Sequence, residues 1–389
     1  MKTEITDNQL FIKNISFVKI SFVAILTTFF AVSAFANTKN DQNSVVGEHS
    51  AMNDEKALKH GDEATEHGEV QNKSGKFDPG KMIMDHIADA HDWHLWGEGH
   101  NSVSISLPVI IYTKSKGITL FSSSRFEHGH AAFKGYELNP KGHIVWEDKT
   151  NFETIYDISL SKNVVAMLIA VLTLCIIIIK MANSYVKNKG KAPKGIHNLI
   201  EPLIIFIRDD VGIPSIGKKT DKFMPLLLTV FFFIFINNIF GLIPIFPGGA
   251  NVTGNIAITM VLAVIIFLTV NLNGNKNYWK HIFLPDVPVW MYVIIIPIEV
   301  LGVILKPFVL MLRLFANITA GHIIILGFFS LIFIFGAMSP AGGLGVSPLS
   351  VAFTVFMGLL EMLVAFLQAF VFTLLSAIYI GMAVEENHH

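Results

Sequence analysis

Two long stretches of this chain carry no charged side chain, and they restrict its fold more than any other feature. Residues 223–275 contain no Asp, Glu, Lys or Arg, and residues 163–179 form a second run of the same kind. A helix crosses the hydrocarbon core of a bilayer with about 20 apolar residues. The chain is therefore predicted to be an integral membrane protein with several spans. Its net charge of −1 averages a wet part and an apolar part, so it says nothing about partners. No nucleic-acid partner is expected.

The N-terminus has the pattern of an export signal. Basic residues precede the apolar run "ISFVAILTTFFAVSAFA", which ends in the small-x-small site at Ala34, Phe35 and Ala36. Residues 1–36 are predicted to be a signal peptide cleaved after Ala36, with an uncleaved anchor as the alternative. Either way, the residues that follow are delivered outside the cytoplasm. The single cysteine, Cys175, excludes an intrachain disulfide.

Two different segments follow the signal. Residues 37–80 are polar, acidic and histidine-containing, with few large apolar side chains, which predicts a disordered tail. Residues 81–160 contain the β-rich runs "SVSISLPVIIYT" and "ITLFSSSRF". These runs predict a small β-containing domain that rests on the extracytoplasmic surface of the membrane. The segment "HIADAHDWHLW" holds His86, His91 and His94. These three are either metal ligands or surface histidines of a helix.

Residues 161–389 are predicted to be the membrane domain. Residues 180–222 carry nine Lys or Arg against four acids, so this loop is predicted to be cytoplasmic. It also contains an apolar-faced segment that is expected to lie along the interface. The apolar stretch 289–338 is long enough for two spans or for one oblique helix, so hydropathy leaves five and six spans open. The other predicted spans are 163–179, 224–243, 256–270 and the last long segment, 349–384.

Ionisable side chains inside the last two apolar segments form two stripes. Glu299, Lys306 and Arg313 are spaced by seven, so they share one side of a helix, and Asn317 lies on that side too. On the last segment Glu361 and Gln368 are again seven apart, and Tyr379 continues that stripe. Such groups either form internal salt bridges that hold helices together or mark an ion path. Two stripes favour the ion path.

The motifs that carry these stripes resemble a known family. "LKPFVLMLRLFANITAG", "LLEMLVAFLQAFVFTLLSAIYIGMA" and "INNIFGLIP" together resemble the a subunit of bacterial Fo-type ATP synthases, over about residues 160–384. The resemblance implies an all-α membrane fold: five transmembrane helices and an interfacial helix, with the last two spans forming a long tilted hairpin. The small β-containing extracytoplasmic domain lies outside the widely shared part.

The resemblance also implies a function and partners. The protein would be a non-catalytic stator channel that conducts protons through two half-channels and so couples proton flow to rotation and ATP synthesis. Its partners would be the rotor ring of c subunits, the b-type peripheral stalk, indirectly the catalytic head, and the lipid bilayer, with no cofactor. It would sit in the bacterial inner membrane with a cytoplasmic C-terminus. The choice between H⁺ and Na⁺ is largely made by the rotor site.

The family's proton-translocation residues transfer onto matching positions. Arg313 would face an ionised carboxylate on the rotor, which explains a permanent cation among apolar residues. If the hairpin is antiparallel with Arg313 level with Gln368, then His322 faces Glu361, roughly 10–13 Å outward. Glu299 lies roughly 21 Å the other way, near the cytoplasmic exit. Many bacterial relatives have Glu and His exchanged at the His322 and Glu361 positions. The remaining residues of the set are Asn317, Lys306 and Asn238.

Two interpretations from other classes stay open beside the stator channel. A secondary transporter would also place charges at the midplane, but it should show paired repeat halves with broken helices, and this sequence has no such repeat. A metal-binding receptor with a membrane anchor would place the function in residues 81–150. A ring of small hairpin subunits that purifies with the protein would distinguish the stator channel from both.

Overall fold

The computed structural model describes residues 78–96, 103–139, 142–151, 153–187, 195–243, 248–285 and 287–385. The predicted signal peptide and most of the predicted tail lie outside these residues. The described chain falls into two compact units. One contains residues 163–321 and 358–385, and the other contains residues 78–162 and 322–357.

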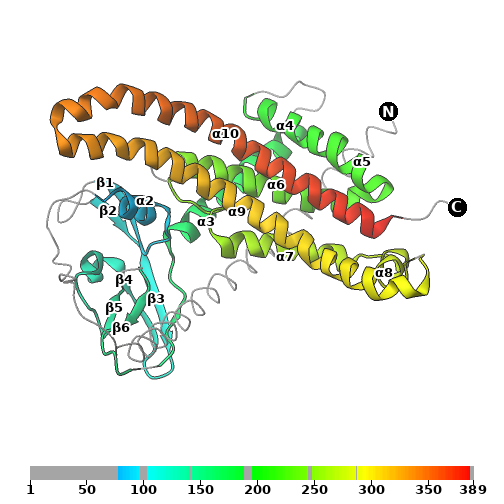
Figure 1. Ribbon diagram of the computed structural model, residues 1–389, viewed down its shortest axis with the longest axis horizontal. Helices are drawn as coiled ribbons and strands as arrows, with labels where there is room; N and C mark the ends of the chain where they lie inside the picture. Colours follow the sequence, from blue (N-terminus) through cyan, green and yellow to red (C-terminus); the bar gives the residue numbers. More distant parts are fainter. Residues whose placement is uncertain are drawn as a thin grey trace, which may run out of the picture. The chain divides into compact units, whose positions relative to one another are not determined.

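Short strands dominate the part before the first long helix (Figure 1). Three small antiparallel sheets pair β1 with β2, β3 with both β4 and β7, and β5 with β6. Gly117, with a φ of +66°, makes the tight turn into β4 possible, because L residues rarely adopt that conformation. The elements are α2 (Pro79–Ile87), β1 (Asp92–Trp96), β2 (Val103–Ser106), β3 (Pro108–Thr113), β4 (Gly117–Ser122), β5 (Tyr136–Leu138), β6 (Ile144–Trp146) and β7 (Tyr156–Asp157).

The core of this region lies on one face of the central sheet. Alternate residues of β3 point into the core, so Val109 and Ile111 are fully buried. Tyr112, also on β3, points the other way and is exposed. Tyr136 from β5 stacks on Trp146 from β6, with ring centroids 4.8 Å apart. The buried cluster is completed by Phe126, Ile144 and Ile155.

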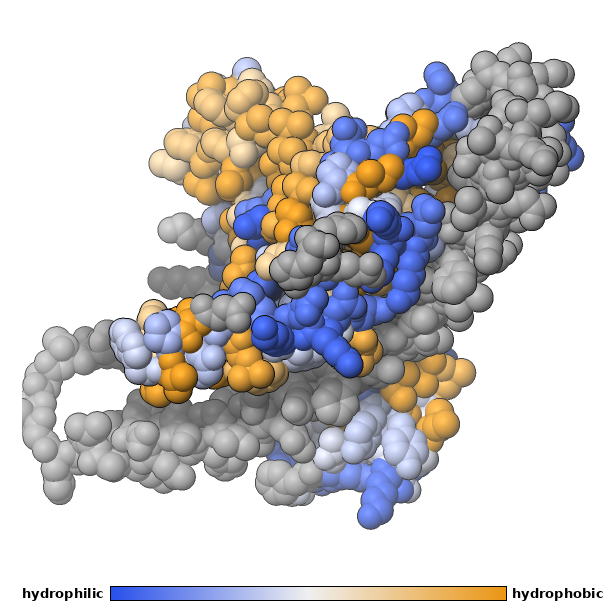
Figure 2. Space-filling model, turned by 90° about the vertical axis from the view of Figure 1, so that its right-hand side faces the viewer, coloured by the Kyte–Doolittle hydropathy of each residue, from blue (hydrophilic) through white to orange (hydrophobic). Residues whose placement is uncertain are grey.

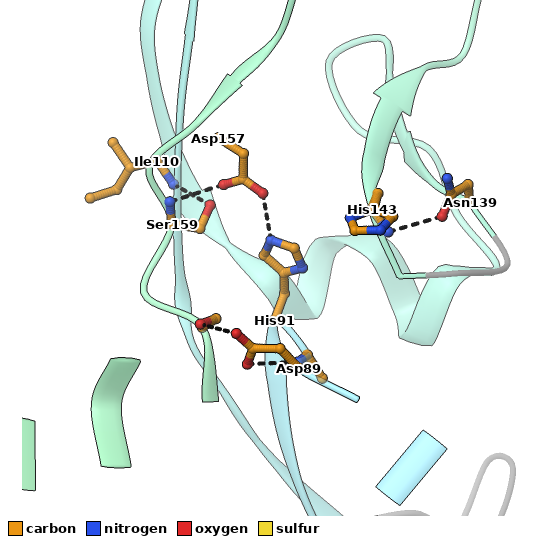
Figure 3. A network of polar contacts seen from close by, with 9 residues as sticks. Asp89, His91, Ile110, Asn139, His143, Asp157 and Ser159 are labelled. Carbon is orange, nitrogen blue, oxygen red and sulfur yellow. Dashed lines mark hydrogen bonds and ion pairs between the residues drawn. The ribbon is translucent and has the colours of Figure 1, made fainter. Parts of the chain in front are cut away.

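One histidine of the "HIADAHDWHLW" segment is buried, which corrects the expectation of a helix with surface histidines. Helix α2 ends at Ile87, so His91 lies in the connection to β1. The His91 Nε2 atom is 2.8 Å from the Asp157 carboxylate, which also accepts the Ser159 backbone N–H (Figure 3). His94 lies on β1, and its side chain is not among those that the structure describes. No group of three described His, Cys, Asp or Glu side chains is arranged to hold a metal.

Electrostatics explains why His91 tolerates burial. Burial alone lowers the pKa of His91, but the hydrogen bond and the charge of Asp157 outweigh it, and the pKa is raised above its ordinary 6.5. Burial alone raises the pKa of Asp157, but the hydrogen bonds from His91 and Ser159 hold it below its ordinary 3.8. The pair therefore favours its ionised form, His⁺ with Asp⁻.

Apolar helices make up the rest of the chain, which is a predominantly helical membrane protein. Four helical segments of the described chain are long and apolar enough to span a bilayer, or five if α7 and α8, bent by 101° at their junction, count as one. A π-helical turn at Ile207–Gly212 joins α4 to α5. The helices are α3 (Lys162–Lys187), α4 (His197–Phe206), α5 (Ile213–Ile216), α6 (Thr220–Leu242), α7 (Ile256–Leu272), α8 (Lys276–Phe283), α9 (Tyr292–Met338) and α10 (Pro340–Val384).

The long apolar stretch is a single helix. Helix α9 has 47 residues and contains Pro297 and Pro307 without a break. At 1.5 Å per residue it is about 70 Å long, whereas the hydrocarbon core is about 30 Å thick, so α9 cannot cross the bilayer upright. Helix α10 returns antiparallel to α9. Gly321 lies against Glu361, and the Phe328 and Phe353 rings stack with centroids 5.1 Å apart, which is the predicted register to within one residue.

The free end of α10 is tied to the bundle by hydrogen bonds. The Asn275 backbone N–H donates to the Ala383 carbonyl at 2.8 Å, and its side-chain amide donates to Val384 at 2.9 Å. These bonds satisfy carbonyls that a helix end leaves without intrahelical partners. Figure 2 looks onto the side of the molecule where the α10 end and α8 lie, and hydrophilic side chains gather there between hydrophobic areas. Exposed charged residues include Lys276 and Lys280 on α8, Asp221 and Lys222 at the start of α6, and Lys218 just before it.

Candidate functional site

Arg313 lies on the outward side of α9. Leu310, Leu314 and Ile318 are almost fully buried and define the face that packs inward, while Arg313 and Asn317 are exposed beside that face. Positions four apart share a side of a helix, so the two sets form neighbouring stripes. Within the described residues, Arg313 forms no ion pair with an acid. The guanidinium group of Arg313 is therefore exposed on the surface of α9.

Glu361 lies on α10 at a contact with α9. Its side chain is only 4% exposed, and Gly321 on α9 provides the space that it occupies. A Cβ atom built on Gly321 would lie 2.7 Å from the Oε1 atom of Glu361, closer than real Cβ contacts allow. Only glycine at this position leaves the carboxyl group where it is. His322, the next residue of α9, is half-buried.

Asn238 connects three segments next to Glu361. It lies on α6, is 3% exposed, and its side-chain amide donates to the Ala365 carbonyl of α10 at 3.2 Å. Its oxygen accepts the hydroxyl proton of Thr253, from the segment before α7. The Thr319 hydroxyl of α9 lies 3.4 Å from the Gly254 carbonyl of that same segment. Hydrogen bonds therefore join α6 to α10 at Ala365, one turn from Glu361, and join the loop before α7 to both α6 and α9.

Gln368 lies two turns beyond Glu361 on α10 and is buried, with 9% of its surface exposed. It is on the same stripe as Glu361, as the spacing of seven predicts. The next polar residues, Thr373 and Ser376, donate their hydroxyl protons to carbonyls of their own helix, at 2.8 and 2.7 Å. They therefore carry no free polar group toward the stripe.

A second polar group lies on the other side of Arg313 along α9. The Lys306 ammonium is 5.6 Å from the centroid of the Tyr379 ring of α10, within cation–π distance. Both side chains line a pocket together with Asn271 of α7 and Tyr278 of α8. The Tyr278 hydroxyl is 3.5 Å from the Asn271 Oδ1 atom. Glu299 is half-buried and close enough to Tyr278 to interact with it electrostatically.

Comparison with known proteins identifies the family. The family described as ATP synthase A chain matches residues 164–381, more than half of the chain. This chain belongs to that family. It is 45% identical to ATP synthase subunit a of Chloroherpeton thalassium over 240 residues, which are 60% of this chain and 69% of the relative. It is 40% identical to ATP synthase subunit a 2 of Chlorobium luteolum over 295 residues, 68% of this chain and 84% of the relative.

A relative from a third genus shows similar identity. ATP synthase subunit a of Myxococcus xanthus is 41% identical over 241 residues, 60% of this chain and 75% of that protein. A separate family, described as a domain of unknown function, matches residues 82–164. The membrane part is therefore a bacterial F-type ATP synthase a subunit. This membership argues against the transporter interpretation.

The structure adds residues to the ATP synthase a subunit site that the search for intramembrane charges did not find. Gly321 lies against the Glu361 carboxyl, Thr253 donates to Asn238, and Thr319 lies near the Gly254 carbonyl. Asn271 and Tyr278 line a pocket with Lys306. Gly321, Thr253, Thr319 and Asn271 do not ionise, and Tyr278 precedes the last two apolar segments, so the pattern of ionisable residues in those segments includes none of the five. The local sequence around Thr253, "NVTGN", follows a turn and precedes an apolar run, so it indicates the start of a helix but not the contact that Thr253 makes.

Proposed function

We propose that this chain is the stator proton channel of a bacterial ATP synthase. The observation that carries the proposal is Arg313, exposed midway along α9 without an acidic partner among the described residues. A cation at the centre of a bilayer costs about 3 kcal/mol on insertion scales. A carboxylate on a rotor subunit would offset most of this cost. Because a fixed positive charge lowers the pKa of such a carboxylate, each rotor site would discharge its proton opposite Arg313.

The polar groups on the two sides of Arg313 are proposed to line separate half-channels. Gly321 lies eight residues along α9 from Arg313, about 12 Å, and the Glu361 carboxyl of α10 lies against it. With His322 and Asn238, Glu361 would form the outer, proton-entry path. Lys306 lies seven residues the other way, about 10 Å, and with Glu299 would lead to the cytoplasm. Asn317 and Gln368 would lie beside Arg313 at the rotor. Arg313 would keep protons from passing directly between the two paths.

The proposed arrangement in the membrane follows the charge distribution. Residues 180–222 would be cytoplasmic, the C-terminus would be cytoplasmic, and residues 37–160 would lie outside the cytoplasm after removal of residues 1–36. Five spans would result, with α7 and α8 serving as one bent span. The c ring and the b-type stalk would be direct partners in the inner membrane. The subunit itself would have no catalytic site. Rotation would be driven by protons crossing the membrane potential, which releases about 2.3 kcal/mol per charge per 100 mV.

Replacement of Arg313 by Lys tests this proposal. The ammonium group keeps the charge but is a compact, strongly hydrated point charge that can lose its proton when buried. We expect ATP synthesis driven by a proton gradient to fall to background in vesicles that contain the assembled Arg313→Lys enzyme. The matched control is Arg208→Lys, at an exposed arginine of the π-helical turn, which should retain full activity. Near-normal synthesis by the Arg313→Lys enzyme would refute the role of Arg313.

A further inference from the structure

The outward side of the β4–β3–β7 sheet is apolar, although the other side already packs on the domain core. Ile118 is 75% exposed and Leu120 63%, and Tyr112, Tyr156 and Ile158 are each more than a third exposed. We call these five residues the outer sheet face. They form one surface: Tyr112 is paired with Ile118 of β4 on one side and with Tyr156 of β7 on the other. The two tyrosine rings are 6.0 Å apart.

This sheet runs directly into the first membrane helix. After β7, the Ile158 and Leu160 backbone N–H groups donate to the Ile110 and Pro108 carbonyls, at 2.9 and 3.2 Å, so the pairing continues to Leu160. Lys162, the first residue of α3, donates its backbone N–H to the Ala90 carbonyl at 2.8 Å. Lys162 is therefore the one residue of α3 that belongs to the same compact unit as the sheet, and the next residue begins the other unit.

The short connection limits how far the outer sheet face can be from the bilayer. Ile158 precedes Asn163, where the charge-free run begins, by only five residues. An extended chain advances about 3.3 Å per residue, so Ile158 lies at most about 17 Å from the start of the hydrocarbon core. The polar headgroup layer occupies the first several Å of that distance. Chain continuity therefore places this face within reach of the bilayer.

The composition of the face fits the lipid interface better than a polar protein surface. It contains three aliphatic side chains, two tyrosines and no charge. Tyrosine is enriched at membrane–water interfaces, where its ring is apolar and its hydroxyl remains hydrated. The exposed Lys114, two residues after Tyr112, provides an ammonium group that can meet lipid phosphate. We propose that the outer sheet face rests on the lipid headgroups of the leaflet that α3 enters, with Ile118 and Leu120 inserted among them.

The test places a fluorescent label on the face in the full-length protein. In a Cys175→Ala background, Ile118→Cys is labelled with an environment-sensitive nitrobenzoxadiazole dye and reconstituted into phosphatidylethanolamine–phosphatidylglycerol vesicles. The control label is at Thr150→Cys, an exposed position in the β6–β7 connection. We expect the label at residue 118 to emit at shorter wavelength and to be quenched at least about twofold more than the control by lipids with a nitroxide headgroup. Because Ile118 is exposed, its replacement leaves the core intact.

Two results would overturn the proposal. If the label at residue 118 is quenched by iodide in the water as strongly as the control, the face is open to solvent. If it is shielded from both iodide and nitroxide lipid, another protein surface covers the face, whether a second copy or another segment of this chain. Leu120→Cys, on the same strand and face, provides a second position with the same expected outcome. Retained tryptophan fluorescence of the labelled proteins shows that the domain has folded.

Discussion

Gly321→Ala should block the proposed outer proton path without preventing the subunit from folding. The new methyl group would lie 2.7 Å from the Glu361 Oε1 atom and 2.9 Å from its Cδ atom, so one group must move. The colliding atoms are the end of a flexible side chain, so the carboxyl group should turn away while the helices stay in place. Overpacking of this kind costs about 1–3 kcal/mol. Replacement of a helical glycine by alanine returns about 1 kcal/mol.

The net change in the free energy of unfolding is therefore small, about 0–2 kcal/mol of destabilisation. Displacement of the Glu361 carboxyl group should instead lower the passive proton permeability of the membrane sector by about tenfold or more. A tenfold loss corresponds to an increase of about 1.4 kcal/mol in the barrier to proton conduction. The assay is the decay of a potassium-diffusion potential in vesicles that contain the membrane sector without the catalytic head. ATP-driven proton pumping by the whole complex should fall in parallel.

The matched control is Gly302→Ala on the same helix, because a Cβ atom there would have no neighbour within 4 Å. This variant should conduct protons normally and be slightly more stable. Glu361→Asp in the Gly321→Ala background shortens the acid by one methylene group and should restore part of the conduction. If Gly321→Ala conducts as well as Gly302→Ala, the position of the Glu361 carboxyl has no part in the path. The reasoning would then fail.

Two further predictions concern histidines. His322→Glu combined with Glu361→His should recover more proton-driven ATP synthesis than either single change, with a parallel recovery of permeability; recovery of assembly alone would mean a structural pair. The His91–Asp157 pair should stabilise the β-sheet region before α3 most between about pH 4 and 6.5, because its contribution falls as pH rises through the raised pKa of His91 and as pH drops through the lowered pKa of Asp157. Thermal unfolding of the purified protein from below to above this range measures the effect, and His91→Gln should remove the loss of stability at higher pH.

The positions of the apolar helices and of the charged residues among them were predictable from the sequence. Charge-free runs mark the membrane segments because transfer of ionised groups into hydrocarbon is unfavourable, and this rule needs no tertiary information. The spacing of seven put Glu361 and Gln368 on one stripe for the same local reason. Periodicity could not decide whether residues 289–338 form one helix or two, because both are equally apolar. The structure has one helix, whose length prevents an upright crossing.

Tertiary structure alone decided which neutral groups surround the charges. Thr253 reaches Asn238 from 15 residues away and Ala365 accepts a hydrogen bond from Asn238 across 127 residues, so no local pattern predicts either contact. Gly321 is one of many glycines in the sequence, and its importance comes only from the Glu361 carboxyl on the facing helix. His91 was expected on a helix surface but is buried, because Asp157 from β7 stabilises its charge. Burial and partnership of polar side chains depend on segments far apart in the chain, whereas membrane insertion depends on each segment by itself.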